Sequence, residues 1–321
     1  MLSRVANNVY WTSRYLERAE NTARIVNVHG NMLLDLPSSL GVGWEPLLAI
    51  TGSGELFYRH YRNADERNVV KFLLTDTRNP GSILMSLASA RENLRSSRDI
   101  VPRESWEAVN DCHRFARERV EEGITKRNRY EFTKHIMRVI QQVSGFLDGS
   151  MSRDIAYCFV RMGRHMERAD MTSRVLDVRA ANLLPPADRG DGVSQDPLVN
   201  TQWMSVLKSV TAYQMYRQHM RFRVTGPDVL RFLLQNREFP RAFFFCMDQL
   251  EHVLKELPHP EAALRRVARL QRRIQSADVH ALAERGLHEF IDDLQIGLGE
   301  LHGDLDALYF RGTPAPETAG D

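Results

Sequence analysis

Residues 15–28 read YLERAENTARIVNV, and residues 165–178 read HMERADMTSRVLDV. Together with the arginine that precedes each stretch, Arg14 and Arg164, the two 15-residue windows share seven identities at a spacing of 150 residues. Two unrelated windows of ordinary composition would share roughly one. The chain therefore contains an internal repeat, and this repeat has the dipeptide Glu-Arg at its centre.

The repeat extends beyond these windows. The triplet Phe-Leu-Leu at residues 72–74 recurs at residues 232–234, and each copy ends six residues before a proline. A repeat of this length that occurs only twice indicates gene duplication, because solenoid proteins need at least three shorter units. We therefore expect two homologous halves, residues 1–150 and 151–311, that pack about a pseudo-two-fold axis.

The hydrophobic pattern predicts helices. Between Val5 and Leu33, apolar and small residues recur in alternating steps of four and three, which is typical of one face of a long helix. The second copy keeps this register from Ile155 to Leu183. Each helix is expected to contain about 30 residues and to be roughly 45 Å long.

The predicted fold class is therefore all-α. Helix-start signals indicate about six helices in each half, or about twelve in a helical bundle, and no run alternates as a strand would. The last ten residues, 312–321, contain no large apolar side chain, and we expect a disordered tail.

Composition excludes several classes of protein. The 321 residues carry a net charge of only +2, which gives no general attraction to nucleic acid. No apolar run is long enough to span a membrane, and the N-terminus does not resemble a signal peptide. The three cysteines are widely spaced and fit a reducing compartment, so a cytoplasmic location is expected. The sequence is compatible with a homo-oligomer.

The repeated Glu-Arg segment is the strongest candidate for a binding site. Its polar residues lie on the side of each helix opposite the apolar face, and a merely solvated face has no reason to keep the same charges in both copies. The residues of this candidate site are Arg14, Glu17, Arg18, Asn21 and Arg24 in the first copy and Arg164, Glu167, Arg168 and Arg174 in the second.

Three interpretations of these charges compete. The first is local, with Glu20–Arg24 and Asp170–Arg174 as ion pairs one helical turn apart. The second is structural, with each glutamate of the motif pairing with the motif arginine of the other copy across the pseudo-two-fold axis. The third is functional, with the arginines forming a pocket for an anion and the glutamates orienting them or acting on a bound group.

A second, weaker candidate lies only in the first half. Asn79 and Ser82 stand at a predicted helix start, where free backbone amides could hold an anion, and Arg91 and Arg98 would extend that basic surface. The alternative interpretation is a helix cap followed by a solvated basic face, which we favour.

No metal site or cofactor site is predicted on this chain. A di-iron bundle needs two Glu-x-x-His motifs, and the single match contains Pro258, which disrupts helical geometry. Nucleotide-binding and hydrolase motifs are not found in the sequence, so the catalytic residues, if any, are unknown.

The N-terminal residues 1–24, MLSRVANNVYWTSRYLERAENTAR, resemble the opening of the bacterial Alpha-E family, a helical family with a Glu-Arg motif. Asn79-Pro-Gly-Ser82, Trp106-Glu-Ala-Val-Asn110 and the closing Tyr309-Phe310 also resemble that family. The resemblance covers residues 1 to about 311, and the family motif corresponds here to Glu17-Arg18 and Glu167-Arg168.

This resemblance implies partners. Alpha-E proteins tend to be encoded beside, or fused to, ATP-grasp and transglutaminase-like proteins, which indicates a role in peptide ligation or modification. We therefore expect a helical component of such a system that binds an anionic group or the partner enzyme through its Glu-Arg faces. The alternative is a non-catalytic scaffold whose Glu-Arg pairs only determine helix packing.

Overall fold

The computed structural model describes residues 3–35, 42–181, 197–220 and 223–311. In these ranges the chain consists of α-helices and their connections, without a strand, so the expected all-α class is confirmed. None of the helices in the described ranges is long and apolar enough to cross a membrane. The tail expected to be disordered, residues 312–321, lies outside the described residues.

Eight α-helices precede residue 151 and eight follow it. In the first set these are α1 (Ser3–Asp35), α2 (Glu45–Ile50), α3 (Gly54–Tyr58), α4 (Glu66–Leu74), α5 (Ile83–Arg95), α6 (Arg103–Glu118), α7 (Val120–Ile124) and α8 (Lys126–Ser150). In the second set they are α9 (Ile155–Ala181), α10 (Pro197–Ser209), α11 (Tyr213–His219), α12 (Gly226–Gln235), α13 (Phe243–Lys255), α14 (Glu261–Gln275), α15 (Val279–Glu284) and α16 (Leu287–Leu305), which continues into the π-helical turn η2 (Asp306–Phe310).

The expected number of about twelve helices is wrong, because the described residues form sixteen α-helices. The difference comes from short elements: α2, α3, α7, α11 and α15 have only five to seven residues. A helix of two turns or fewer does not repeat its apolar residues often enough to show a period of 3.6.

Local sequence explains where several helices begin. The carboxylate of Asp65 accepts a hydrogen bond from the Asn68 amide at the start of α4, and Ser82 caps α5 through the Met85 amide. Thr225 caps α12 in the same way. Such side-chain acceptors satisfy amides that have no partner inside the helix.

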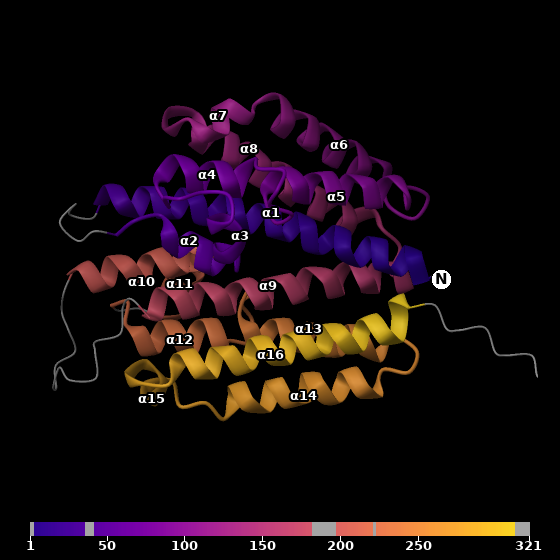
Figure 1. The fold of residues 1–321 in the computed structure, drawn as a ribbon. Coiled ribbons are helices and arrows are strands. Elements are labelled where there is room, and N and C mark those ends of the chain that lie inside the picture. The colour runs from indigo at the N-terminus through magenta and orange to yellow at the C-terminus, as the bar shows by residue number, and fades with distance from the viewer. Residues whose placement is uncertain (1–2, 36–41, 182–196, 221–222, 312–321) are drawn as a thin grey trace, which may run out of the picture.

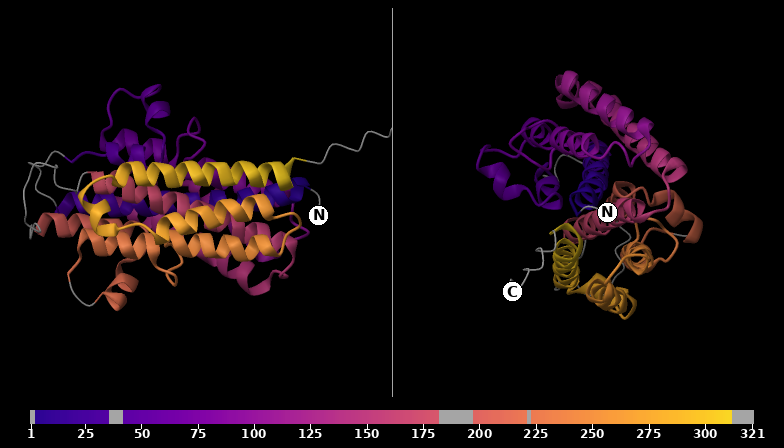
Figure 2. Two further views of the ribbon diagram at one scale, coloured as in Figure 1. Left: turned by 90° about the horizontal axis from the view of Figure 1, so that it is seen from below. Right: turned by 90° about the vertical axis from the view of Figure 1, so that its right-hand side faces the viewer.

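The two long helices, α1 and α9, lie side by side through the middle of the molecule (Figure 1). Helices α5 and α8 pack on α1, and α13 and α16 pack on α9. The end-on view in Figure 2 places most of the indigo-to-magenta helices on one side and most of the orange-to-yellow helices on the other. The short helices cross over, because α2 contacts α9 and α10 contacts α1.

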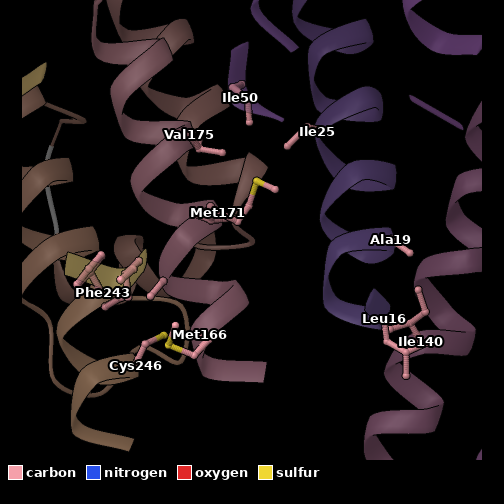
Figure 3. Close-up of a cluster of buried hydrophobic side chains, with 14 of the residues drawn as sticks. Leu16, Ala19, Ile25, Ile50, Ile140, Met166, Met171, Val175, Phe243 and Cys246 are labelled. Carbon is pink, nitrogen blue, oxygen red and sulfur yellow. The ribbon is translucent and has the colours of Figure 1, made fainter. Parts of the chain in front are cut away.

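Buried apolar residues from both sides form one continuous core. Leu16 and Ala19 of α1 face Ile140 of α8, whereas Met171 of α9 lies toward Ile25 of α1 (Figure 3). Nearly every face of α1 is therefore covered by protein, including the side that carries the charged motif.

One glycine permits the close approach of the two long helices. A β-carbon at Gly163 of α9 would lie 2.2 Å from the carbonyl oxygen of Tyr10 and 3.1 Å from the β-carbon of Ser13, both in α1. Real β-carbons do not approach a backbone oxygen that closely, so any other residue would push the helices apart.

We therefore expect Gly163→Ala to lower the free energy of unfolding by about 1–3 kcal/mol. This loss is expected although alanine is favoured over glycine in helices by about 1 kcal/mol. Gly145→Ala in α8 is the matched control, since a β-carbon there meets no atom within 4 Å. The control should gain stability by about 0.5–1 kcal/mol. Urea unfolding of both variants measures the difference, and equal gains would contradict the close approach.

Candidate functional site

The Glu-Arg motifs of α1 and α9 form crossed ion pairs. The Arg168 Nε donates to Glu17 Oε2 at 3.1 Å. Conversely, Arg18 donates through Nε to Glu167 Oε1 at 2.6 Å and through a terminal nitrogen to Oε2 at 2.9 Å. Each glutamate thus pairs with the arginine of the other motif, as the structural interpretation of the sequence expects.

Each glutamate also has a second arginine partner. Arg14 of α1 donates to Glu167 Oε2 at 2.8 Å. Arg241, two residues before α13, donates to Glu17 Oε1 and to the Asn21 side-chain oxygen, the latter at 2.9 Å. Both oxygens of both carboxylates therefore accept hydrogen bonds from arginines.

The pairs one helical turn apart are present as well. Arg24 binds Glu20 within α1, and Arg174 Nε lies 2.9 Å from Asp170 Oδ1 within α9. Arg241 links the first of these pairs to the centre, because it lies 3.2 Å from Glu20. We call the whole network the Glu-Arg layer; it comprises Arg14, Glu17, Arg18, Glu20, Asn21, Arg24, Glu167, Arg168, Asp170, Arg174 and Arg241.

The centre of the Glu-Arg layer is sealed from solvent, since Glu17 is 4% exposed and Glu167 is 1% exposed. Removing a carboxylate from water costs several kcal/mol, which only close cationic partners and hydrogen bonds offset. The outer arginines Arg18 and Arg174 remain partly exposed. The burial of the two glutamates favours a structural role for the motif.

The two glutamates at the centre of the layer are held in their ionised forms. Burial alone would raise the pKa of Glu17, but Arg168, Arg241 and Arg164 outweigh it and lower that pKa to about 2. The pKa of Glu167 is also lowered, because Arg18 and Arg14 outweigh the effect of burial. Both glutamates are therefore anions at neutral pH and have no proton to donate.

Arg164 takes a different position from its counterpart, Arg14. It lies 3.0 Å from both carboxylate oxygens of Asp148 in α8 and does not bond to a glutamate of the layer. The two copies of the motif thus share their central pairs but differ at the first arginine.

The polar residues of the weaker candidate site bind to neighbouring protein groups or lie on the surface. Asn79 accepts a bond from the Gly81 amide at 2.9 Å and donates to the Phe72 carbonyl at 3.1 Å, while Ser82 is fully buried as the cap of α5. Arg91 donates to the Asn110 side chain at 2.7 Å. Arg98 is exposed beside Asp99. These contacts favour the cap and surface interpretation, whereas ligand binding there stays a prediction.

Sequence reasoning missed Arg241 and Gln141. Gln141 of α8 donates to Glu20 at 3.2 Å, and Arg241 joins three residues of α1. The internal repeat could not reveal Arg241, because the corresponding position of the first half is Gly81. Its only signal was an arginine immediately after Pro240 in a loop that precedes a strongly apolar helix.

We expect Glu167→Gln to lower the free energy of unfolding by about 3–5 kcal/mol, because Arg14 and Arg18 would lose their buried counter-ion. The matched control is Glu92→Gln, which removes the carboxylate of an exposed pair with Arg95 and should cost less than about 1 kcal/mol. Urea unfolding compares them, and a fully stable Glu167→Gln would contradict the structural role.

The lowered pKa of Glu17 predicts an acid-dependent loss of stability. Its pKa is about 2 in the folded chain against an ordinary value of 4.5, so its contribution is complete above pH 4.5 and declines as the pH falls toward 2. This contribution is on the order of 3 kcal/mol. The difference in unfolding free energy between the parent protein and Glu17→Gln should therefore shrink over that range; a constant difference would disprove it.

Comparison with known proteins agrees with this architecture. The model of the Alpha-E family, described as "a predicted alpha-helical domain with a conserved ER motif", matches residues 1–310. The Glu-Arg dipeptides of α1 and α9 both lie within the matched range. No solved structure matches the chain significantly.

Two mycobacterial proteins are similar to this chain. The "Uncharacterized protein Mb2597" of Mycobacterium bovis and the "Uncharacterized protein Rv2567" of Mycobacterium tuberculosis are each 20% identical over 322 residues. Each alignment includes 92% of this chain but only 35% of the relative, so the chain spans about a third of the length of these proteins. With nearly its whole length matched by the family model, the chain belongs to the Alpha-E family.

Proposed function

We propose that this protein is a rigid, non-catalytic helical component of an ATP-grasp-associated peptide ligation or modification system. In this proposal the Glu-Arg layer holds the two halves in one arrangement, and the outer surface binds the partner enzyme. The observation that supports it most is the complete pairing of Glu17 and Glu167 in a buried position.

The geometry of the layer argues against acid-base catalysis by these glutamates. A general acid or base is most effective when its pKa is close to the operating pH. Burial and the surrounding arginines leave Glu17 with a pKa of about 2, and all its oxygens are engaged. A substrate would have to displace an arginine from a buried pair before either glutamate could act.

The proposal includes duplication of one unit. Eight helices follow in the same order in residues 1–150 and 151–311, and α5 and α13 each contain 13 residues. The crossed pairs and the reciprocal contacts of α2 with α9 and of α10 with α1 support packing about a pseudo-two-fold axis parallel to the long helices.

The partner is proposed to be an ATP-grasp-type protein, with a transglutaminase-like protein as a further member of the system. The family resemblance supplies these classes. The relatives that match this chain extend over roughly three times its length, which supports a module that works beside other protein segments. A cytoplasmic location is proposed because ATP is available there, and the three buried cysteines are unpaired.

The test is co-expression with an ATP-grasp-type protein from the same genome. We expect the two proteins to elute as a complex in size-exclusion chromatography. We also expect the ATP turnover of the partner, measured as ADP release with added peptides, to depend on this chain. Glu92→Gln should leave both unchanged. The proposed function would be refuted if the ATP-grasp-type protein did not bind this chain and hydrolysed ATP at the same rate with and without it.

A further inference from the structure

Two adjoining pockets open on the first half, away from the Glu-Arg layer. The smaller, of about 200 Å³, lies between the C-terminal part of α1, the start of α4 and the start of α8. The larger, of about 370 Å³, lies between α7 and the starts of α4 and α8. Both are lined by Glu66, Lys126 and Arg129. The smaller pocket also contains Trp44 and two asparagines of α1, Asn27 and Asn31.

Arg129 is a buried cation with unused hydrogen-bond donors. It is 7% exposed, and its guanidinium lies 5.3 Å from the centre of the Trp44 ring. One terminal nitrogen donates to Glu66 at 2.8 Å and the other to the Ile124 carbonyl at 3.1 Å, while Nε has no partner among the described residues. Two of its five N–H groups are therefore satisfied by protein.

The start of α8 adds further positive charge. Its first four residues, 126–129, are Lys-Arg-Asn-Arg, and no acidic residue lies in its first turn. The N-cap residue Thr125 does not cap the helix, because its hydroxyl donates backward to the Glu121 carbonyl at 2.7 Å. Cations at the positive end of a 25-residue helix are unfavourable unless an anion accompanies them.

The smaller pocket also presents apolar surface. Its rim includes Leu34 and Tyr130, which are 67% and 52% exposed and belong to the few large apolar side chains that face solvent in the described ranges. Trp44 contributes an aromatic surface inside, and the buried Asn27 amide nitrogen has no hydrogen-bond partner in the part of the chain that the structure describes. The pocket thus combines cationic, amide and apolar groups within a small volume.

We propose that this pocket binds the C-terminal carboxylate of a peptide, with the last side chain of that peptide against Trp44 and the apolar rim. Lys126 and Arg129 bind the carboxylate, and the asparagine amides bind the adjacent peptide group. The identity of the ligand as a peptide rests on the proposed function, whereas the preference for a carboxylate rests on the charges of the pocket.

Glu66 distinguishes a carboxylate from a phosphate. In the smaller pocket it opposes Lys126 and Arg129, so the three side chains together carry a single positive charge. A monoanionic carboxylate neutralises that charge, whereas a phosphate dianion would leave an excess negative charge beside Glu66. The volume of about 200 Å³ also fits one terminal residue rather than a nucleotide.

The second half does not repeat the charged residues of the pocket. Helix α16 begins with Leu287 where α8 begins with Lys126, and α12 begins with Gly226 where α4 begins with Glu66. A β-carbon at Gly226 would lie only 3.0 Å from the ring of Trp203, the counterpart of Trp44, so the α12 backbone itself covers that ring. The charged pocket is therefore a feature of the first half.

The test uses the full chain alone with N-acetyl-alanyl-leucine, the same peptide as its C-terminal amide, and inorganic phosphate, by titration calorimetry. We expect the free acid to bind at least about tenfold more tightly than the amide, because only the free acid carries the charged carboxylate that Lys126 and Arg129 bind. Equal binding of acid and amide, tighter binding of phosphate than of the acid, or binding of none of them would each overturn the proposal.

Matched variants locate the binding to this pocket. Lys126→Met should weaken binding of the free acid at least about fivefold, whereas Arg127→Met removes a neighbouring charge that does not line either pocket and should change it less than about twofold. Glu66→Gln should tighten binding, because it removes the competing carboxylate of Arg129. Equal effects of Lys126→Met and Arg127→Met would place the binding elsewhere.

This experiment is separate from the test of the proposed function. Peptide binding is measured without any partner enzyme, so a complex with the ATP-grasp-type protein but no peptide binding would overturn only the pocket assignment. Peptide binding without such a complex would overturn only the proposed function.

Discussion

The crossed pairing of Glu17 with Arg168 and of Glu167 with Arg18 is the constraint on which the rest of the fold depends. Apolar contacts alone would tolerate several relative positions of two long helices. A slip by one helical turn of about 5.4 Å would leave buried carboxylates facing apolar side chains, which is far more costly. The pairs thus select one register, and Gly163 permits the close approach that this register requires.

The charged residues of the molecule form two groups with different environments, the Glu-Arg layer and the pocket around Arg129. Every carboxylate of the Glu-Arg layer is paired with an arginine of that layer, and the layer is mostly shielded from solvent, so its main effect is on the arrangement of helices. The charges around Arg129 are only partly neutralised and border open pockets. A motif that identifies a family need not be the place where its members contact ligands, because internal packing also limits which residues are acceptable.

The sequence predicted the long helices well because their apolar pattern continues over many turns. It also pointed to the crossed pairs, since the internal repeat retained both glutamates and both arginines. Arg241 could not be predicted, because the other half has Gly81 at that position and the contact joins residues 224 positions apart. The pocket was missed for a related reason: Glu66 comes from α4 and Lys126 and Arg129 come from α8, which lies about 60 residues later, and the three residues have no internal counterpart.

The pairing of α1 with α9 also has a consequence for biosynthesis. Glu17 leaves the ribosome about 150 residues before Arg168, so the first half is made while the most important neighbour of α1 is still missing. During that interval α1 exposes both an apolar face and unpaired charges, and its central helix contact closes over a very long loop, which slows folding. The nascent chain is therefore expected to depend on chaperones until α9 has emerged and the two long helices can associate.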